Sequence, residues 1–315
     1  MVKPRILIFG EIGTELVLKT SELPAPGQTR RGEDFYEIPG GSGLFTAVGL
    51  ARIGADPVMA GRLGDDVRAG QLSEFMTQES VDVRFLSRTR NGSTGLSVRM
   101  GQPGAKDRIL TFPGAGERFS ESDVEDAFIC YPDAVVLTRG VPPHTASDII
   151  RRCRSRNLPL FLADLPDRTG DPGRRIASCE VLIASEEDAL AMTGIRPSDQ
   201  EKCMKACLAL SSQITAKYVV LRLGERGCFL FDGLYYHFFP AFDVPQPAGV
   251  SSVDAFTAAF VFAYQRTEGD AKRAAEFAVI VSAVFLTRGG GLRGFPTYEE
   301  VRRFITRNEI ECELP

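Results

Sequence analysis

Short apolar segments alternate along this chain with longer segments whose apolar residues recur at helical spacing. The strand-like segments cover residues 6–9, 58–60, 134–137, 158–163, 181–183 and 218–223. The helix-like segments cover residues 44–53, 69–79, 146–156, 186–192, 200–211, 255–266 and 271–287. Strands that are apolar throughout and separated by helices are typical of parallel pairing, because the crossover helices cover both faces of the sheet. The pattern therefore predicts a three-layer α/β/α fold with a central, mostly parallel sheet.

Three regions depart from this alternation. Residues 228–231 and 235–239 flank a glycine-containing turn, which predicts an antiparallel hairpin near the edge of the sheet. Residues 14–38 are polar, and residues 93–112 largely alternate between polar and apolar types. We expect these last two regions to form a small extra sheet, inserted within a single domain of residues 1–315, that acts as a lid. Two separate surface hairpins are the alternative.

The composition argues against several classes of protein. The chain has 315 residues and a formal net charge of −4, whereas proteins that bind nucleic acid usually carry a basic face. No segment reaches the ~18 apolar residues of a membrane span, and the apolar run at residues 6–9 is too short for a signal peptide. The seven cysteines include no Cys-x-x-Cys pair, which favours reduced thiols in a cytoplasmic protein. Cys203 and Cys207 are expected to be buried on a helix.

A glycine-rich turn precedes the helix-like segment 44–53. Gly40, Gly41, Ser42 and Gly43 would let the backbone turn tightly and let a ligand approach it closely. The N–H groups at the start of the following helix would be open to the hydroxyls of a small polar ligand. A turn without a ligand is the alternative.

A second glycine-containing turn follows the strand-like segment 218–223. Gly224 and Gly227 lie at the carboxyl end of that strand, which is the edge where α/β sheets bind ligands. A nucleotide phosphate would fit there, with Arg222 as its charge partner. A strand-turn-strand without a ligand is the alternative.

Asp254 stands at the start of the helix-like segment 255–266. The positive end of a helix dipole favours an ionised carboxylate. Such a carboxylate, placed beside a primary hydroxyl, can accept the proton as the oxygen attacks a phosphorus atom. The alternative is structural. Ser251 and Asp254 have the S-x-x-D spacing of a capping box, in which case Asp254 would only complete the helix start.

With these three motifs in order, the chain resembles the ribokinase-like (PfkB-type) carbohydrate kinases over nearly its whole length. The segments that carry the resemblance are 10–11, 26–27, 40–43, 55–58, 61–66, 93–95, 164–168, 185–189, 223–227, 254–256 and 295–297. The resemblance implies one ribokinase-like domain with a β-lid, the use of ATP and Mg²⁺, and transfer of the γ-phosphate to a sugar-like alcohol.

The resemblance also implies roles for individual residues. Asp254 falls on the family's catalytic base. The other implied groups are Ser251, Ser252 and Val253 in the anion hole, Ser185, Arg222, Gly224, Gly227 and Gly291 at the nucleotide, Glu15, Gly40, Gly41, Ser42 and Phe45 at the sugar, and Glu187 and Asp188 near Mg²⁺.

The chain departs from the family pattern at several of these groups. The family has glycines before the base, whose N–H groups close around the transferring phosphate. Ser251, Ser252 and Val253 end the corresponding segment, and the β-branched Val253 is expected to resist a positive φ. Ala248 replaces an acidic residue, which weakens any monovalent-cation site. Ser185 replaces the asparagine of the Mg²⁺ motif.

Three positions on the sugar side bear on the substrate. Glu15 replaces an aspartate of the family, and Phe45 replaces an asparagine, which puts simple pentoses and hexoses in doubt. Ser42 stands where some relatives that accept sugar phosphates carry a lysine, so a phosphorylated substrate is not expected.

Two functions are compatible with these observations. The first is an ATP-dependent kinase of a small sugar-like substrate, with Asp254 as base. The alternative is a catalytically impaired pseudokinase that binds a ligand or a protein partner, because the anion hole, the Mg²⁺ motif and the sugar contact have all changed. A homodimer that forms through the lid is a further expectation, with the alternating face of residues 93–100 as the candidate interface.

Overall fold

The computed structural model describes residues 3–102, 107–163, 178–245 and 251–315. Its largest element is a nine-stranded sheet with the order β13-β12-β11-β10-β9-β8-β1-β4-β5. The pairs β11–β12 and β12–β13 are antiparallel and the others are parallel. The strands are β1 (Arg5–Phe9), β4 (Asp56–Gly64), β5 (Asp82–Thr89), β8 (Ala134–Leu137), β9 (Leu160–Ala163), β10 (Cys179–Ser185), β11 (Ala216–Arg222), β12 (Gly227–Phe231) and β13 (Tyr236–Pro240).

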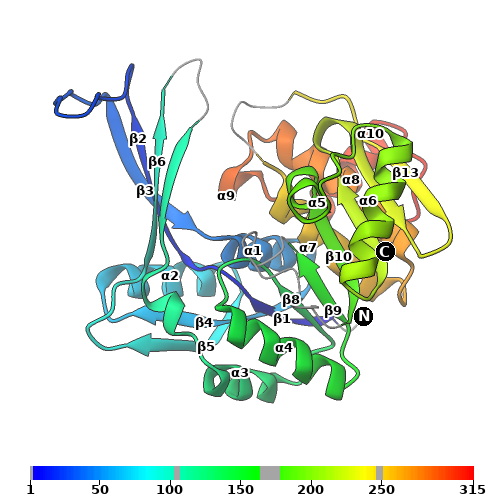
Figure 1. Cartoon of the computed structure of the whole chain (residues 1–315), viewed down its shortest axis with the longest axis horizontal. Coiled ribbons are helices and arrows are strands. Elements are labelled where there is room, and N and C mark those ends of the chain that lie inside the picture. The colour runs from blue at the N-terminus through cyan, green and yellow to red at the C-terminus, as the bar shows by residue number, and fades with distance from the viewer. Residues whose placement is uncertain (1–2, 103–106, 164–177, 246–250) are drawn as a thin grey trace.

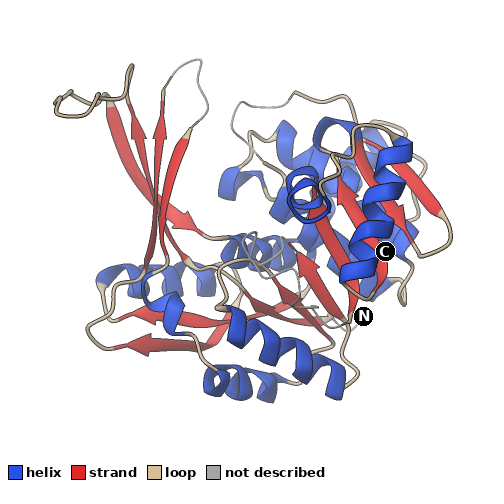
Figure 2. Ribbon diagram, in the orientation of Figure 1, coloured by secondary structure: helices blue, strands red, loops and turns tan. Residues whose placement is uncertain are grey.

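Helices cover both faces of this sheet (Figures 1 and 2), which confirms the predicted three-layer fold. One layer contains α1 (Ser42–Ile53), α2 (Val67–Gln78), α7 (Val253–Arg266), α8 (Ala271–Thr287) and α10 (Tyr298–Arg307). The other contains α3 (Glu121–Ala127), α4 (Pro143–Ser155), α5 (Glu186–Thr193) and α6 (Gln200–Gln213). A short helix, α9 (Gly291–Gly294), lies between α8 and α10 along the chain.

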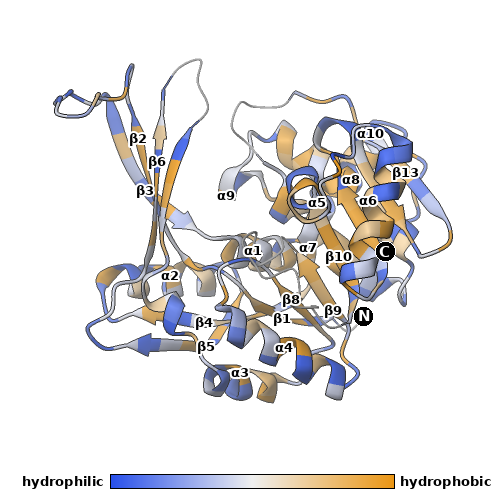
Figure 3. Cartoon of the chain, viewed as in Figure 1, coloured by the Kyte–Doolittle hydropathy of each residue, from blue (hydrophilic) through white to orange (hydrophobic). Residues whose placement is uncertain are grey.

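The central strands are apolar throughout because each of their faces packs against a helix layer. In β1, Ile6 and Ile8 belong to one core, whereas Leu7 and Phe9 belong to the other, since side chains alternate along a strand. All four side chains are fully buried. The strands of the large sheet accordingly carry much of the strongly hydrophobic sequence in Figure 3.

A second, four-stranded sheet projects from the body of the molecule (Figure 1). Its order is β3-β2-β6-β7, and we call it the small sheet. The strands are β2 (Gly13–Lys19), β3 (Asp34–Gly40), β6 (Gly95–Gly101) and β7 (Arg108–Phe112). Its action as a lid, and the assignment of the chain to a single domain, stay predictions.

Several local predictions are also decided by the structure. The hairpin at the sheet edge is present as β12 and β13, and Cys203 and Cys207 are buried on α6 as expected. In the described residues, no helix combines the length and the hydrophobicity that a bilayer crossing requires. Strand β5 and helix α3 were not expected from the sequence, because β5 is half-exposed and mixed in character and α3 is short and largely polar.

Candidate active site

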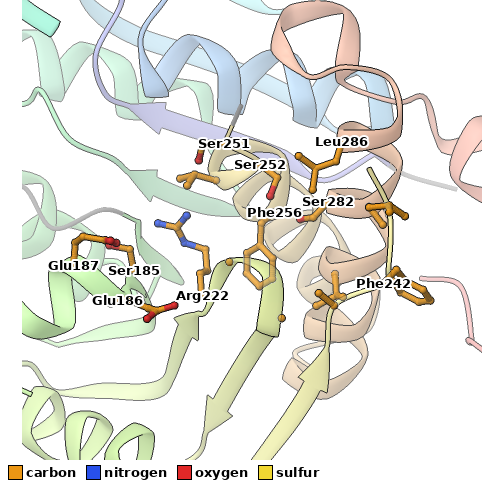
Figure 4. A pocket seen from close by; sticks show the side chains of 17 residues that line it. Ser185, Glu186, Glu187, Arg222, Phe242, Ser251, Ser252, Phe256, Ser282 and Leu286 are labelled. Atoms are coloured by element: carbon orange, nitrogen blue, oxygen red, sulfur yellow. The ribbon is translucent and has the colours of Figure 1, made fainter. Parts of the chain in front are cut away.

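A cleft with a cavity of about 300 Å³ lies where the carboxyl ends of β10 and β11 meet α7 and α8. Parallel strands end at one edge of the sheet, so the segments that follow them converge there. Ser185 ends β10, and Arg222 stands opposite it in register at the end of β11. The polar residues of the cleft are Ser185, Glu186, Glu187, Arg222, Gly224, Gly227, Ser251, Ser252 and Ser282 (Figure 4).

The start of α7 forms one wall of this cleft. Val253 is the first helical residue and Ser252 is the N-cap, with no hydrogen bond from the backbone to its side chain. The capping interpretation of Asp254 is therefore wrong, because it needed Ser251 as the N-cap. Helices α3, α5 and α10 do carry capping boxes. The first N–H groups of a helix lack intrahelical partners, so this end of α7 presents donors and a positive dipole to an anion in the cleft.

Val253 adopts an ordinary helical conformation. None of the non-glycine residues with positive φ among the described residues lies near it. The expected conflict between a β-branched side chain and a positive φ is thus absent, because Val253 starts a helix instead of extending a glycine-like loop. Ala248, the predicted position of a weakened cation site, lies outside the described residues.

Arg222 brings a positive charge into the cleft. Arg222 is only 9% exposed, and Figure 4 shows its side chain extending between Ser185 on one side and Ser251 on the other. A guanidinium group in this position can form paired hydrogen bonds with phosphate oxygens.

The turn after β11 is held rigidly. Gly227 has φ 105°, and a Cβ atom there would lie 2.0 Å from the carbonyl oxygen of Phe239, so the position requires glycine. Arg226 donates to the carbonyl oxygens of Pro197 (2.6 Å) and Ser198 (2.8 Å), and it pairs with Glu186 at 3.0 Å. Sequence reasoning missed Arg226 and Glu186, although both lie within the motifs it examined.

The predicted metal ligands differ in their position. Glu187 is exposed and lines the cleft. Asp188 is 2% exposed, and its Oδ2 atom accepts from the N–H (2.9 Å) and the hydroxyl (2.6 Å) of Ser185. A bond from that oxygen to a metal ion would break the cap of α5. The described residues contain no group of three or more His, Cys, Asp or Glu side chains that could hold a metal ion.

The opposite wall of the cleft is apolar. It consists of Ala241, Phe242, Val244, Val253, Phe256, Val279, Ala283 and Leu286. A wall of this kind suits a flat nucleotide base, while the polar end of the cleft suits its phosphates. From this set, the sequence assigned a site role only to Val253. Gly291, which it assigned to the nucleotide, is exposed and does not line the cleft.

The predicted sugar residues lie around the start of α1 and the base of the small sheet. Gly41 is the N-cap of α1, and Ser42 donates a hydrogen bond to Thr138 Oγ1 at 2.9 Å. Glu15 forms a two-bonded ion pair with Arg99, at 2.7 and 3.1 Å. Phe45 is half-buried and packs against Phe295 at the edge of the core, with 6.2 Å between ring centres.

Helices α1 and α7 bring the predicted sugar residues and the cleft residues to the same edge of the large sheet. They pack side by side, with Gly49 of α1 against Ala258 of α7. Each helix begins at the carboxyl edge of the sheet, so Asp254 at the start of α7 lies on the side where Ser42 starts α1. The predicted sugar residues do not themselves line the cleft described above.

Comparison with known proteins agrees with this arrangement. Residues 3–297 match the family described as pfkB family carbohydrate kinase. The chain is 23% identical to a ribokinase of Bacillus subtilis, over 96% of this chain and 99% of that protein. It is 25% identical to an ATP-dependent ribose-1-phosphate kinase of Halopiger xanaduensis, over 96% of this chain and 98% of that protein. The structure of Arabidopsis thaliana ribokinase complexed with ribose and ATP superposes with a TM-score of 0.84, at 20% identity, over 97% of this chain and 99% of that one. The chain belongs to the pfkB family of carbohydrate kinases.

Proposed function

We propose that this protein transfers the γ-phosphate of ATP to a hydroxyl group of a small sugar-like substrate, with Asp254 as the general base. The observation that carries the proposal is the position of Asp254. It lies in the first turn of α7, next to the residues that line the cleft, and it does not cap that helix. A carboxylate beside a phosphate-binding helix start is where a proton acceptor for phosphoryl transfer is needed.

The bond changes are those of an in-line displacement. The substrate oxygen bonds to the γ-phosphorus while the bond from that phosphorus to the β-phosphate oxygen breaks, and ADP leaves with the electron pair. Asp254 accepts the hydroxyl proton. The first N–H groups of α7 and the Arg222 guanidinium stabilise the negative charge on the transferring group.

Mg²⁺ fits the site as a partner of the nucleotide phosphates. The ion commonly keeps several water ligands and takes one or two carboxylates together with phosphate oxygens. Of the two carboxylates that line the cleft outside the helix cap, Glu186 pairs with Arg226, so Glu187 is the candidate for a water-mediated contact with Mg²⁺. Bound Mg²⁺ would neutralise phosphate charge during transfer.

The pseudokinase alternative gains no support from the relatives, which are named as sugar kinases. Part of its motivation was the expected strain at Val253, and that strain is absent.

The decisive test of the proposal uses the purified protein with ATP and Mg²⁺. We expect calorimetry to show micromolar binding of the nucleotide, and a panel of pentoses, hexoses and nucleosides to show ADP release with at least one acceptor. Binding of no nucleotide, together with no turnover for any acceptor, would contradict the proposal.

We also propose that the small sheet covers the sugar end as a lid and that two copies of the chain pair through its outer face. The register places Leu16, Leu18, Leu96, Val98, Met100, Phe35, Leu110 and Phe112 on one face of this sheet. Phe35, Leu110 and Phe112 are 72%, 54% and 52% exposed. The same face also carries two charged residues, Glu37 opposite Leu16 and Arg108 opposite Met100. Its exposed apolar residues between them are typical of a protein interface. Glu15 and Arg99 project from the other face, toward the sugar residues.

Charges placed on this apolar face should prevent dimer formation. We expect the wild-type protein to have the mass of a dimer in light scattering, and the variant Phe35→Glu/Leu110→Glu to have the mass of a monomer. Ile129→Glu, at a 63% exposed apolar residue on the body of the molecule, is the control and should leave the mass unchanged. A monomeric wild-type protein at high concentration, or a double variant that stays dimeric, would refute the interface.

A further inference from the structure

Arg226 joins the turn after β11 to the start of α5. It ends a short 3₁₀ helix, Gly224–Arg226, directly before Gly227. Its Nη2 atom lies 3.0 Å from the Oε2 atom of Glu186, which is the first residue of α5 and lines the cleft. This ion pair therefore connects the two segments that follow the neighbouring strands β10 and β11 into the cleft.

The guanidinium group of Arg226 is also fixed from its other side. It donates to the carbonyl oxygens of Pro197 at 2.6 Å and Ser198 at 2.8 Å, in the loop between α5 and α6. The carbonyl oxygen of Arg226 accepts from the N–H of Ala241 at 3.3 Å, and Ala241 lines the cleft. A planar guanidinium group with several acceptors around it has little freedom to move. The direction of the Glu186 carboxylate is thus set by a rigid partner.

Glu186 and Glu187 are adjacent acids with different surroundings. Both line the cleft, and Figure 4 shows them beside Ser185 at its polar end. Glu186 is paired with Arg226, whereas in the described residues no ion pair or hydrogen bond engages the exposed carboxylate of Glu187. The cleft therefore contains one acid whose charge is offset and one whose charge is open to a ligand.

The charge of Glu186 matters because the phosphates of a nucleotide are negative. A carboxylate beside them repels them, and the repulsion is stronger in a site from which water is partly excluded. Arg226 offsets this charge from outside the cleft, since it is not one of the residues that line it. Its effect on the nucleotide would therefore pass through Glu186 and not through direct contact.

We propose that Arg226 is a positioning residue of the nucleotide site. By pairing with Glu186 it offsets that charge and keeps the carboxylate turned toward the loop of Pro197 and Ser198, which leaves Glu187 as the acid that faces Mg²⁺. The inference rests on the proposed kinase function, since it concerns the same nucleotide. It extends that function, because neither Arg226 nor Glu186 was among the predicted site residues.

The test measures the binding of ADP by calorimetry, once with EDTA and once with saturating Mg²⁺. Arg226→Gln removes the charge, while its amide can still donate to a carbonyl oxygen of the loop. With EDTA, we expect this variant to bind ADP about tenfold more weakly than the wild-type protein. With Mg²⁺, the loss should be less than about threefold, because the ion offsets the charge of the phosphates and of the released Glu186. Added salt should reduce the loss seen with EDTA, because it screens the repulsion.

Three further variants separate charge from structure. Arg226→Gln/Glu186→Gln lacks the released carboxylate, so it should recover most of the affinity for ADP in EDTA. Arg226→Lys keeps the charge and should retain most of that affinity. Lys217→Met is the matched control, because Lys217 pairs with Glu180 at 2.9 Å and joins the same strands, β10 and β11, at their amino ends. It should leave both affinities unchanged.

The outcomes distinguish this inference from the proposed function. An unchanged affinity in Arg226→Gln overturns the inference. An equal loss with and without Mg²⁺ that Glu186→Gln does not relieve overturns it as well, because Arg226 would then only support the fold of the loop. The expected binding pattern without turnover of any acceptor would support the role of the pair and contradict the kinase proposal. Binding of no nucleotide by the wild-type protein would contradict both.

Discussion

Replacing Asp254 with asparagine should lower kcat by about 10²- to 10⁴-fold, the usual contribution of a general base. The amide has nearly the same shape as the carboxylate, but it does not accept the hydroxyl proton. Asp254 stands in the first turn of α7 but is not part of a capping box, so we expect the free energy of unfolding to fall by no more than about 1 kcal/mol. Steady-state kinetics with the best acceptor of the panel, together with a denaturation curve for each protein, measures both effects.

Two control variants distinguish a loss of catalysis from a loss of stability. Asp243→Asn removes an exposed carboxylate between the cleft residues Phe242 and Val244, and it should leave kcat unchanged. Thr297→Ala removes the N-cap of α10, and it should lower the free energy of unfolding by about 1 kcal/mol without an effect on kcat. If Asp254→Asn behaved like Thr297→Ala, with lower stability and normal turnover, Asp254 would be a structural residue and the proposed mechanism would fail.

The architecture was predictable because the central strands are buried on both faces. Strands β1, β8 and β9 are nearly continuous apolar runs. Such runs can be predicted as buried strands from their own sequence, without knowledge of the strands beside them. Strand β5 is half-exposed and carries charges, so its sequence resembles a loop until β4 is in place beside it. Edge elements of this kind take their structure from the neighbour more than from their own sequence.

The positions of some candidate site residues were predictable because these residues stand at the ends of strands or at the starts of helices. Asp254, Arg222 and Ser185 stand at the ends of regular elements, so the order of strands and helices places them at one edge. The apolar wall was not predictable, because Val279 and Ala283 are ordinary buried positions of α8 that only packing brings to the cleft.

Hydrogen bonds and ion pairs between side chains were equally difficult to predict from the sequence. The resemblance places Asp188 near Mg²⁺, and its spacing from Ser185 also fits a capping box, which is present in the structure. Its role near a metal ion stays a prediction. The contact of Glu15 with Arg99 joins two strands of the small sheet that are far apart along the chain. The sequence around Glu15 and Arg99 does not indicate that these two residues pair.

Replacement of Arg222 with methionine should lower kcat/KM for ATP by about 10²- to 10³-fold, the usual cost of losing one preorganised group that stabilises the charge of a transition state. Methionine retains a similar length and packs well in a buried position, so the strand end should keep its structure. Arg222→Lys should recover part of the loss, because lysine restores the charge without the planar pair of donors. Initial rates over a range of ATP concentrations give kcat and KM separately.

The expected pattern depends on where the guanidinium group lies. Arg222 extends into the cleft near the start of α7, so its loss leaves the helix N-terminus as the remaining protein group that stabilises the transferring phosphate. Arg288→Met is the matched control, since Arg288 follows the cleft-lining helix α8 but pairs with Glu300 outside the cleft. That variant should keep the wild-type kcat and KM. A normal kcat in Arg222→Met, with only KM for ATP raised, would show that Arg222 binds the nucleotide equally in the ground state and the transition state. The protein's charge stabilisation during transfer would then come from the start of α7 and not from Arg222.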